Sequence, residues 1–215
     1  MSAVVDWGRV DYPLAWERMR RLHAERAEGG IPDTLVLVEH PPVVTVGVEG
    51  DDGSSDSSGL PVYRVERGGK STYHGPGQLV GYPIVDLTPR GRDVRAFVQD
   101  VETVLIETLR EFHLLGRHVP SRRGVWIDGE RKVASIGIAV ERWVTFHGFA
   151  LNVDVDLGAF ERIHPCGFDG RVMTSMAREL GRPVSLAEVR PIVGERWAGV
   201  FGRVPRARPI PAPPA

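Results

Sequence analysis

The chain has 215 residues, enough for one ordinary domain with a substantial core, and 42% of them are hydrophobic. With 26% charged residues and a formal net charge of -1, it is typical of soluble globular chains and shows no overall charge favouring nucleic acid or a membrane surface. No segment approaches the roughly 18 consecutive apolar residues of a spanning helix. The first residues also lack a secretion signal, so we expect a cytoplasmic protein.

The first half of the chain combines one helical pattern with several strand-like ones. Residues 12–28 carry apolar side chains at helical spacing, with Pro13 in the first turn, and predict a helix that ends at Gly29-Gly30. The polar segment 50–59 is expected to be a mobile surface loop. Runs of β-branched and apolar residues predict strands at 34–39, 43–46, 62–65 and 79–87.

The second half contains the clearest helix signals. Asp93 is a favourable N-cap for a helix whose apolar stripe continues to Phe112. A short helix is expected near 174–180, and Ser185 with Glu188 forms a capping-box pair that opens a longer one. Asp-Gly at 128–129 indicates a hairpin turn between β-rich runs. The predicted strands of this half are 125–127, 133–140 and 143–153.

The order of these elements indicates the fold class. Helices lie between and after groups of strands without a regular βαβ rhythm, so we expect an α+β fold with a mixed, largely antiparallel sheet packed by helices. A single catalytic domain is predicted over residues 1–204. The Pro-rich segment 205–215 should follow it as an extended tail.

Three segments mix reactive or polar side chains with glycine. They are RGGKSTYHGPGQ at 67–78, RKVASIG at 131–137, and HPCG at 164–167 with Thr174-Ser175 shortly after. In the first, glycines let the backbone approach a ligand closely, although an ordinary turn is equally compatible with them. Gly69-Lys70-Ser71 lacks the spacing of a phosphate-binding P-loop, so the sequence does not indicate ATP binding.

Cys166 is the only cysteine of the chain and lies between Pro165 and Gly167. A lone cysteine forms neither an intramolecular disulfide nor a thiolate metal site, so no metal is expected. A buried thiol that packs as a small hydrophobe and a nucleophile beside a backbone oxyanion donor both fit this context. Lys132 could likewise be a solvated hairpin residue. These residues alone leave the alternatives open.

Taken together, in this order and spacing, the segments resemble the LipB family of lipoyl(octanoyl) transferases. Family members carry an RGG-x-x-T-x-HGPGQ-like segment, then RK-x-A-S-I-G, HG-x-ALN, and PCG followed by TS. The matching segments here are RGGKSTYHGPGQ, RKVASIG, HGFALN at 147–152, and PCG at 165–167 with Thr174-Ser175. The likeness covers about residues 35–180, and Val48 stands where family members often have an arginine.

The resemblance implies the fold shared by biotin protein ligases and lipoate ligases, and the activity of an octanoyl-[acyl-carrier-protein]:protein N-octanoyltransferase without a cofactor. Cys166 would form an acyl-thioester, and Lys132 would lower the pKa of its thiol. The implied substrate-binding residues form three stretches, namely Arg67, Gly68, Gly69, Lys70, Ser71, Thr72, Tyr73, His74, Ser135, Ile136, Gly137, Gly148, Phe149 and Ala150.

The same resemblance implies the partners. The donor would be octanoyl-acyl carrier protein, and whether lipoyl groups are transferred as well stays open. The acceptors would be a specific lysine of the lipoyl domains of 2-oxoacid dehydrogenases and of the glycine cleavage H-protein, as the first step of endogenous protein lipoylation. We hypothesise that Lys132 gives its proton to the departing pantetheine thiolate and then accepts one from the attacking lysine. His74 would line the acyl pocket or orient the carbonyl group, although a role in supporting the loop alone also fits. A basic stretch could dock an acidic carrier protein and comprises Arg117, Arg122, Arg123, Arg131 and Lys132.

Two other functions fit parts of the pattern. An ATP-dependent lipoate or biotin-type protein ligase would share the fold, but it needs no cysteine, and the GRGRxG segment of biotin ligases is absent from this sequence. A non-catalytic acyl-carrier binding module would use Cys166 only to line a pocket and would form no covalent adduct. Neither nucleic acid nor a membrane is an expected partner.

Overall fold

The computed structural model describes residues 2–50, 58–120, 122–161 and 170–202. Within these residues the centre is a seven-stranded sheet with the strand order β1-β2-β6-β10-β9-β8-β7. β1 and β2 run parallel, and the other neighbouring strands of this sheet run antiparallel. The strands are β1 (Ala3–Arg9), β2 (Thr34–Glu39), β6 (Gln78–Ile84), β7 (Gly116–Val119), β8 (Arg122–Ile127), β9 (Arg131–Glu141) and β10 (Val144–Asn152).

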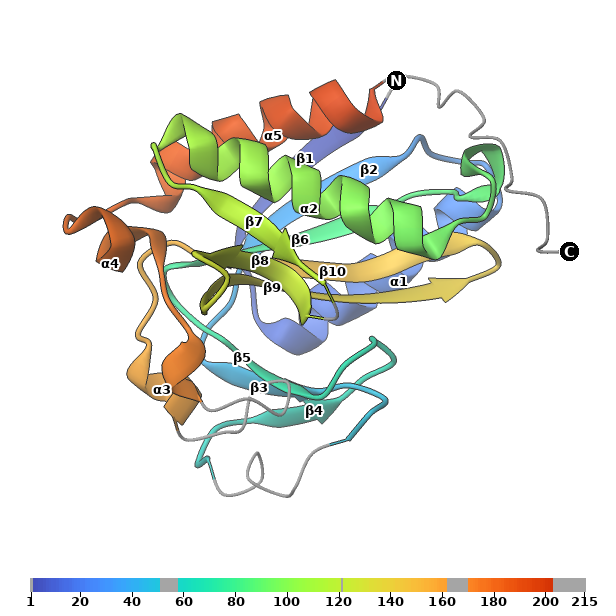
Figure 1. The fold of residues 1–215 in the computed structure, drawn as a ribbon. Coiled ribbons are helices and arrows are strands. Elements are labelled where there is room, and N and C mark those ends of the chain that lie inside the picture. The colour runs from blue at the N-terminus through green and yellow to red at the C-terminus, as the bar shows by residue number, and fades with distance from the viewer. Residues whose placement is uncertain (1, 51–57, 121, 162–169, 203–215) are drawn as a thin grey trace, which may run out of the picture.

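A second, three-stranded sheet has the order β4-β3-β5 in the described part of the chain. Its strands are β3 (Val43–Val46), β4 (Val62–Arg64) and β5 (Ser71–His74). β3 pairs with β4 in parallel and with β5 antiparallel. This small sheet lies below the large one in Figure 1, beside the short helix α3 (Gly158–Glu161).

Helices cover both faces of the large sheet. α2 (Val94–Glu111) and α5 (Leu186–Phe201) lie side by side on one face, and α1 (Tyr12–Ala27) lies on the other (Figure 1). The remaining helical elements are short: α4 (Met176–Leu180) and the 3-10 turns η1 (Thr88–Arg90) and η3 (Gly170–Val172).

Local signals in the sequence explain where the long helices begin. The carboxylate of Asp93 accepts a hydrogen bond from the backbone nitrogen of Ala96 at 2.9 Å and caps α2. Ser185 and Glu188 form the predicted capping box of α5. α1 begins with proline in its first turn, where a missing amide proton costs nothing.

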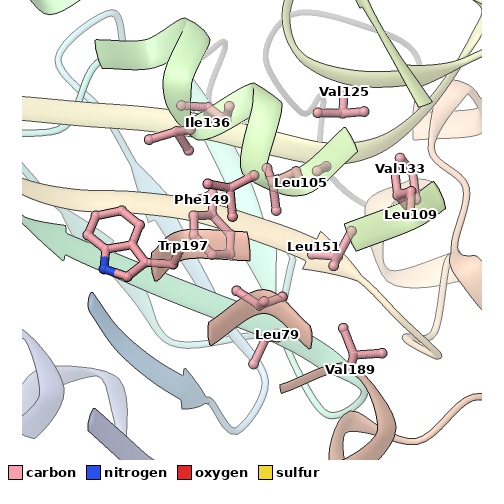
Figure 2. Close-up of a cluster of buried hydrophobic side chains, with 14 of the residues drawn as sticks. Leu79, Leu105, Leu109, Val125, Val133, Ile136, Phe149, Leu151, Val189 and Trp197 are labelled. Atoms are coloured by element: carbon pink, nitrogen blue, oxygen red, sulfur yellow. The ribbon is translucent and has the colours of Figure 1, made fainter. Parts of the chain in front are cut away.

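The large sheet separates two apolar clusters. The main cluster fills the space between the sheet and the helices α2 and α5, and Figure 2 shows Phe149 and Leu151 of β10 among side chains from both helices. The second cluster lies under α1 and includes Val80 of β6 and Ala150 of β10. Because successive side chains of a strand point to opposite faces, β10 contributes to both clusters.

The mixed, largely antiparallel sheet with helices on both faces confirms the predicted fold class. The predicted helices are all present, and so are the predicted strands, although the one expected at 79–87 ends at Ile84. The domain boundary at residue 204 stays a prediction. The Pro-rich tail and most of the expected loop at 50–59 lie outside the described residues. Within the described ranges, no helix combines the length and apolar character needed to cross a membrane.

Three strands were not predicted. β1 and β7 lie at the two edges of the large sheet, and most of their side chains are exposed or half-buried, so neither shows the alternation of a half-buried strand. β5 lies inside the glycine-rich segment 67–78, which suggested a loop. Its four residues are nevertheless all buried.

Candidate active site

A cavity lies where the large sheet faces the small one. It encloses about 470 Å³ of space free of protein atoms, counting its open mouth. Its walls come from both sheets, from the loop before β5 and from the start of α1. The lining residues are Tyr12, Arg67, Gly68, Gly69, Thr72, His74, Val80, Tyr82, Ser135, Ile136, Gly137, His147, Gly148, Phe149 and Ala150.

The strand register builds the floor of the cavity. Ala150 of β10 lies between Val80 of β6 and Ser135 of β9, so three strands contribute one row of small and medium side chains. Gly137 lies opposite Gly148 in the neighbouring row and leaves the sheet surface bare there. The row changes from apolar at Val80 to polar at Ser135, which suits a ligand that has an apolar chain and a polar end.

The opposite wall comes from β5. Thr72 and His74 line the cavity, whereas Ser71 and Tyr73 alternate to the other side of the strand, where the Tyr73 ring packs 5.4 Å from that of Phe160. Lys70 is exposed and does not line the cavity.

Two hydroxyl groups face this cavity without a hydrogen-bond partner in the described part of the chain. They belong to Thr72, whose side chain is 5% exposed, and to Ser135 on the facing sheet. A buried hydroxyl without a partner is unfavourable, because it has lost its hydrogen bonds to water. A group bound in the cavity, water included, would supply the missing partner.

Arg67 is held beside the cavity by an extensive set of hydrogen bonds. Its Nε and Nη2 donate to the hydroxyl of Thr45 at 3.2 and 2.9 Å, and Nη2 also donates to the Thr45 carbonyl at 2.7 Å. A Cβ atom at Gly137 would lie 2.8 Å from the carbonyl oxygen of Gly68 and 3.1 Å from Arg67 Cδ. Glycine at 137 therefore lets the loop of Arg67 approach β9 closely.

His74 is fixed in one neutral tautomer. Its Nδ1 lies 2.7 Å from Oε1 of Gln78, and Gln78 donates its own amide hydrogens elsewhere, so His74 is the donor. Its Nε2 lies 3.4 Å from the Thr45 hydroxyl, which is then the donor. Burial lowers the pKa of His74 to about 3, and the neighbouring His40 and Arg67 act in the same direction. A ring in this state orients groups and does not exchange protons near neutral pH.

Lys132 lies on β9, three positions before Ser135, and is only 2% exposed. Its Nζ is 5.6 Å from the ring centre of Trp126, a cation-π contact, and a Cβ at Gly124 would lie 2.9 Å from Lys132 Cε. Its carbonyl oxygen accepts a hydrogen bond from the backbone of Thr174 at 2.9 Å. Lys132 is thus buried and is not the solvated hairpin residue that the sequence also allowed. Cys166 lies outside the described residues, so its distance from Lys132 stays a prediction.

Comparison with known proteins identifies the family. Residues 11–198 match the model of the lipoyl protein ligase A/B catalytic domain. An octanoyltransferase of Gloeobacter violaceus is 49% identical over 203 residues, which covers 93% of this chain and 90% of the relative. The chain belongs to the octanoyltransferase family. It is therefore an enzyme of the acyltransferase class.

Solved structures confirm that this member of the octanoyltransferase family has the fold shared by lipoate ligases and biotin protein ligases. Lipoate-protein ligase A bound with ATP superimposes with a TM-score of 0.72 at 18% identity, covering 99% of this chain and 90% of the ligase. Biotin protein ligase from Aquifex aeolicus has a TM-score of 0.52 at 11% identity, covering 94% of this chain and 69% of that protein. At these identities the likeness concerns the fold alone.

The family motifs converge on the cavity in space. Eleven of the fourteen predicted substrate-binding residues line it, and Lys70, Ser71 and Tyr73 do not. The lining residues that the sequence did not single out as ligand contacts are Tyr12, Val80, Tyr82 and His147. His147 opens the HGFALN motif and could have been found there. Tyr12 belongs to the apolar stripe of α1, and its ring stacks on His74 at 6.1 Å.

The histidine that opens the HGFALN motif is also neutral. His147 is 2% exposed, and burial, with help from Arg67 and Arg20, lowers its pKa to about 3. Its Nε2 lies 3.1 Å from Oε2 of Glu66 and donates to this carboxylate. A second buried ring, His40, lies between the Val10 carbonyl at 2.7 Å and the Tyr82 hydroxyl at 2.8 Å.

The basic stretch expected to dock a carrier protein is divided by the structure. Arg131 donates to both carboxylate oxygens of Glu179 at 2.8 and 3.0 Å, and this contact is the main reason that the pKa of Glu179 is lowered. Lys132 is buried. Arg123 is exposed but lies 3.0 Å from Glu49, which also accepts a hydrogen bond from the backbone of Gly69. Of the five basic residues proposed, only Arg117, Arg122 and Arg123 remain exposed for docking.

Proposed function

We propose that this chain transfers an octanoyl group from octanoyl-acyl carrier protein, through a thioester on Cys166, to a specific lysine of a lipoyl domain. The observation that carries the proposal is the cavity, whose floor changes from apolar at Val80 and Ala150 to polar at Ser135. The relatives named octanoyltransferase indicate that the acyl group is octanoyl. We call the part of the cavity along Val80, Ala150 and Ser135 the acyl slot.

The acyl chain would lie along the apolar part of this floor. Each methylene removed from water there contributes about 0.8 kcal/mol, so an unbranched chain suits a narrow slot. Its carbonyl group would lie at the polar end, within reach of the hydroxyls of Thr72 and Ser135, which lack a partner among the described residues. Both hydroxyls can donate to a carbonyl oxygen, so the ligand would satisfy the two groups together.

Group transfer would proceed in two displacements. The Cys166 thiolate attacks the thioester carbonyl of the donor, and the pantetheine thiolate leaves with a proton from Lys132. The neutral amine of Lys132 then accepts a proton from the lysine amine that attacks the acyl-enzyme, and the Cys166 thiolate is released. Because Lys132 and Ser135 lie on the same strand, β9 would carry both the proton-transfer group and part of the acyl slot.

Intact-protein mass spectrometry tests the covalent step. The native chain, incubated with octanoyl-acyl carrier protein, should gain the mass of one octanoyl group, and neutral hydroxylamine should remove it as expected for a thioester. The Cys166→Ser variant should gain no hydroxylamine-sensitive adduct. The proposal would be contradicted if the native chain gained no octanoyl group and modified a lipoyl domain only when free octanoate and ATP were supplied. That result would support a ligase.

The two lysines of the chain provide a matched test of proton transfer, since Lys70 is exposed and Lys132 is buried. Lys132→Met should slow acyl-enzyme formation and also transfer from a preformed acyl-enzyme to a lipoyl domain, each by about 100-fold, the size of a general acid-base contribution. Lys70→Met should leave both rates within about twofold. If transfer from the preformed acyl-enzyme proceeds normally in Lys132→Met, Lys132 does not act in the second step.

A further inference from the structure

A continuous chain of buried hydrogen bonds runs from the cavity to the backbone beside Lys132. His74 Nδ1 donates to Gln78 Oε1 at 2.7 Å, and Gln78 Nε2 donates to Asn152 Oδ1 at 3.0 Å. Asn152 Nδ2 donates to the carbonyl oxygen of Thr174 at 2.9 Å. The backbone nitrogen of Thr174 donates to the carbonyl oxygen of Lys132, also at 2.9 Å.

The partners allow only one orientation of each amide in this chain. Gln78 Nε2 also donates to the carbonyl oxygen of Tyr73 at 3.2 Å, so its Oε1 must face His74. Asn152 needs its NH2 group at the Thr174 carbonyl, which leaves its Oδ1 for Gln78. Both amide side chains are 1% exposed, so a reversed amide would leave buried groups unsatisfied.

Asn152 lies where three parts of the structure meet. It is the last residue of β10 and pairs with Gln78, the first residue of β6. The Thr174 segment is tied down from its other side as well, because the Thr174 hydroxyl donates to Glu179 at 2.6 Å and Glu179 is bound by Arg131. Asn152 therefore connects the sheet end that carries His74 and Gln78 to the segment that is bonded to Lys132.

We propose that Asn152 is a positioning residue for acyl transfer. Its side chain does not line the cavity, and it acts by holding the Thr174 backbone, and with it the strand position of Lys132, in fixed relation to His74 and the acyl slot. The proposal rests on the proposed function. It predicts that loss of the Asn152 amide slows the chemical step much more than it weakens binding, because small displacements of reacting groups have large effects on rate.

Two substitutions remove the contact in different ways. Asn152→Ser is smaller and uncharged and withdraws the NH2 group from Thr174. Asn152→Asp keeps the shape but faces the Thr174 carbonyl with a carboxylate, which can donate only when protonated. The control is Thr108→Val, which removes an equally buried hydrogen bond, from the Thr108 hydroxyl to the Val104 carbonyl at 2.8 Å within α2.

The experiment compares single-turnover acyl-enzyme formation from octanoyl-acyl carrier protein with the affinity for octanoyl-pantetheine amide, which cannot acylate the enzyme. Asn152→Ser should lower the single-turnover rate about tenfold or more and change the Kd less than about threefold. Thr108→Val should change neither by more than about twofold at a similar loss of Tm. The rate of Asn152→Asp relative to the native chain should rise between about pH 8.5 and about pH 5.5, as the buried carboxyl gains its proton.

The outcomes separate the two proposals. A native chain that forms no acyl-enzyme overturns the proposed function and this inference together. If the native chain reacts and both Asn152 variants match Thr108→Val in rate, or lose rate and affinity in equal proportion, Asn152 has only a structural role and this inference alone fails. Reduced melting temperatures are accounted for by the Thr108→Val control.

Discussion

Gly81 on β6 lies directly opposite Phe149 on β10, and a Cβ atom at Gly81 would lie 2.1 Å from Phe149 Cζ. The ring of Phe149 belongs to the main core below α2 and α5 (Figure 2). Gly81→Ala should therefore overpack the core and lower the free energy of unfolding by about 1–3 kcal/mol, measured by urea denaturation. Gly81→Ala combined with Phe149→Leu should recover part of this loss.

The control for this substitution is Gly199→Ala in α5, where an added Cβ meets no atom within 4 Å. Alanine is favoured over glycine inside a helix, so this variant should gain about 0.5–1 kcal/mol. Equal effects of the two substitutions would show that the contact with Phe149 does not determine the cost at Gly81.

The hydroxyls of Thr72 and Ser135 provide a prediction that separates function from stability. Thr72→Val and Ser135→Ala remove polar groups without a partner in the described structure, so Tm should stay unchanged or rise. If the hydroxyls bind the acyl carbonyl group, kcat/KM with octanoyl-acyl carrier protein should fall by up to about tenfold for each, the equivalent of one hydrogen bond. Native kcat/KM in both variants would exclude this contact.

The floor of the slot predicts chain-length preference. Ala150→Leu adds volume between Val80 and Ser135 and should shift the preference from octanoyl toward shorter donors. Val80→Ala removes two methyl groups and should favour longer ones. Because one methylene is worth about 0.8 kcal/mol, each shift should be about fourfold per carbon in the ratio of kcat/KM values. If the kcat/KM ratios between hexanoyl, octanoyl and decanoyl donors are the same in both variants as in the native protein, the acyl group does not lie along this floor.

The buried histidines predict how stability depends on pH. Burial lowers the pKa values of His40, His74 and His147, the last two to about 3. The unfolded chain binds protons on these rings below about pH 6.5 while the folded chain does not, so the free energy of unfolding falls as the pH falls. His74 and His147 should each contribute up to about 2 kcal/mol of loss between about pH 7 and pH 5, and His40 acts in the same direction.

Urea denaturation at both pH values measures this slope. His147→Asn should reduce the dependence of the free energy of unfolding on pH, because asparagine binds no proton in either state. The contributions of His40 and His74 should remain. The control is His113→Asn, at an exposed position whose left-handed backbone also suits asparagine, and the slope should persist there. An unchanged slope in His147→Asn would mean that His147 does not resist protonation.

Local patterns were sufficient to predict most of the fold. The cap of α2, the capping box of α5 and the turn at Asp128-Gly129 each depend on neighbours within four residues, so the sequence displays them directly. The edge strands β1 and β7 depend on partners far along the chain. Their exposed side chains leave no periodic pattern from which to predict them.

The site was predictable only as far as its motifs. The glycine-rich motifs predicted the position of the cavity because glycine lets the backbone approach a ligand or a neighbouring segment closely. Had 71–74 been recognised as a strand, its period of two would have separated Thr72 and His74 from Ser71 and Tyr73. Tyr12 and Tyr82 reach the cavity only through the packing of α1 and the pairing of β6, which no local pattern reports.

The shared strand register has a consequence for how this site can change. In β10, the Phe149 side chain belongs to the main core and that of its neighbour Ala150 to the opposite face, where the slot lies, so inserting or deleting one residue in this strand would exchange the faces of the two side chains. A protein altered in that way would place the large Phe149 ring on the face of the slot and leave a gap in the main core. Misalignment of the active-site strand would therefore cause failure to fold before it could cause altered specificity, so we expect changes of substrate choice within β10 to be substitutions and not insertions or deletions.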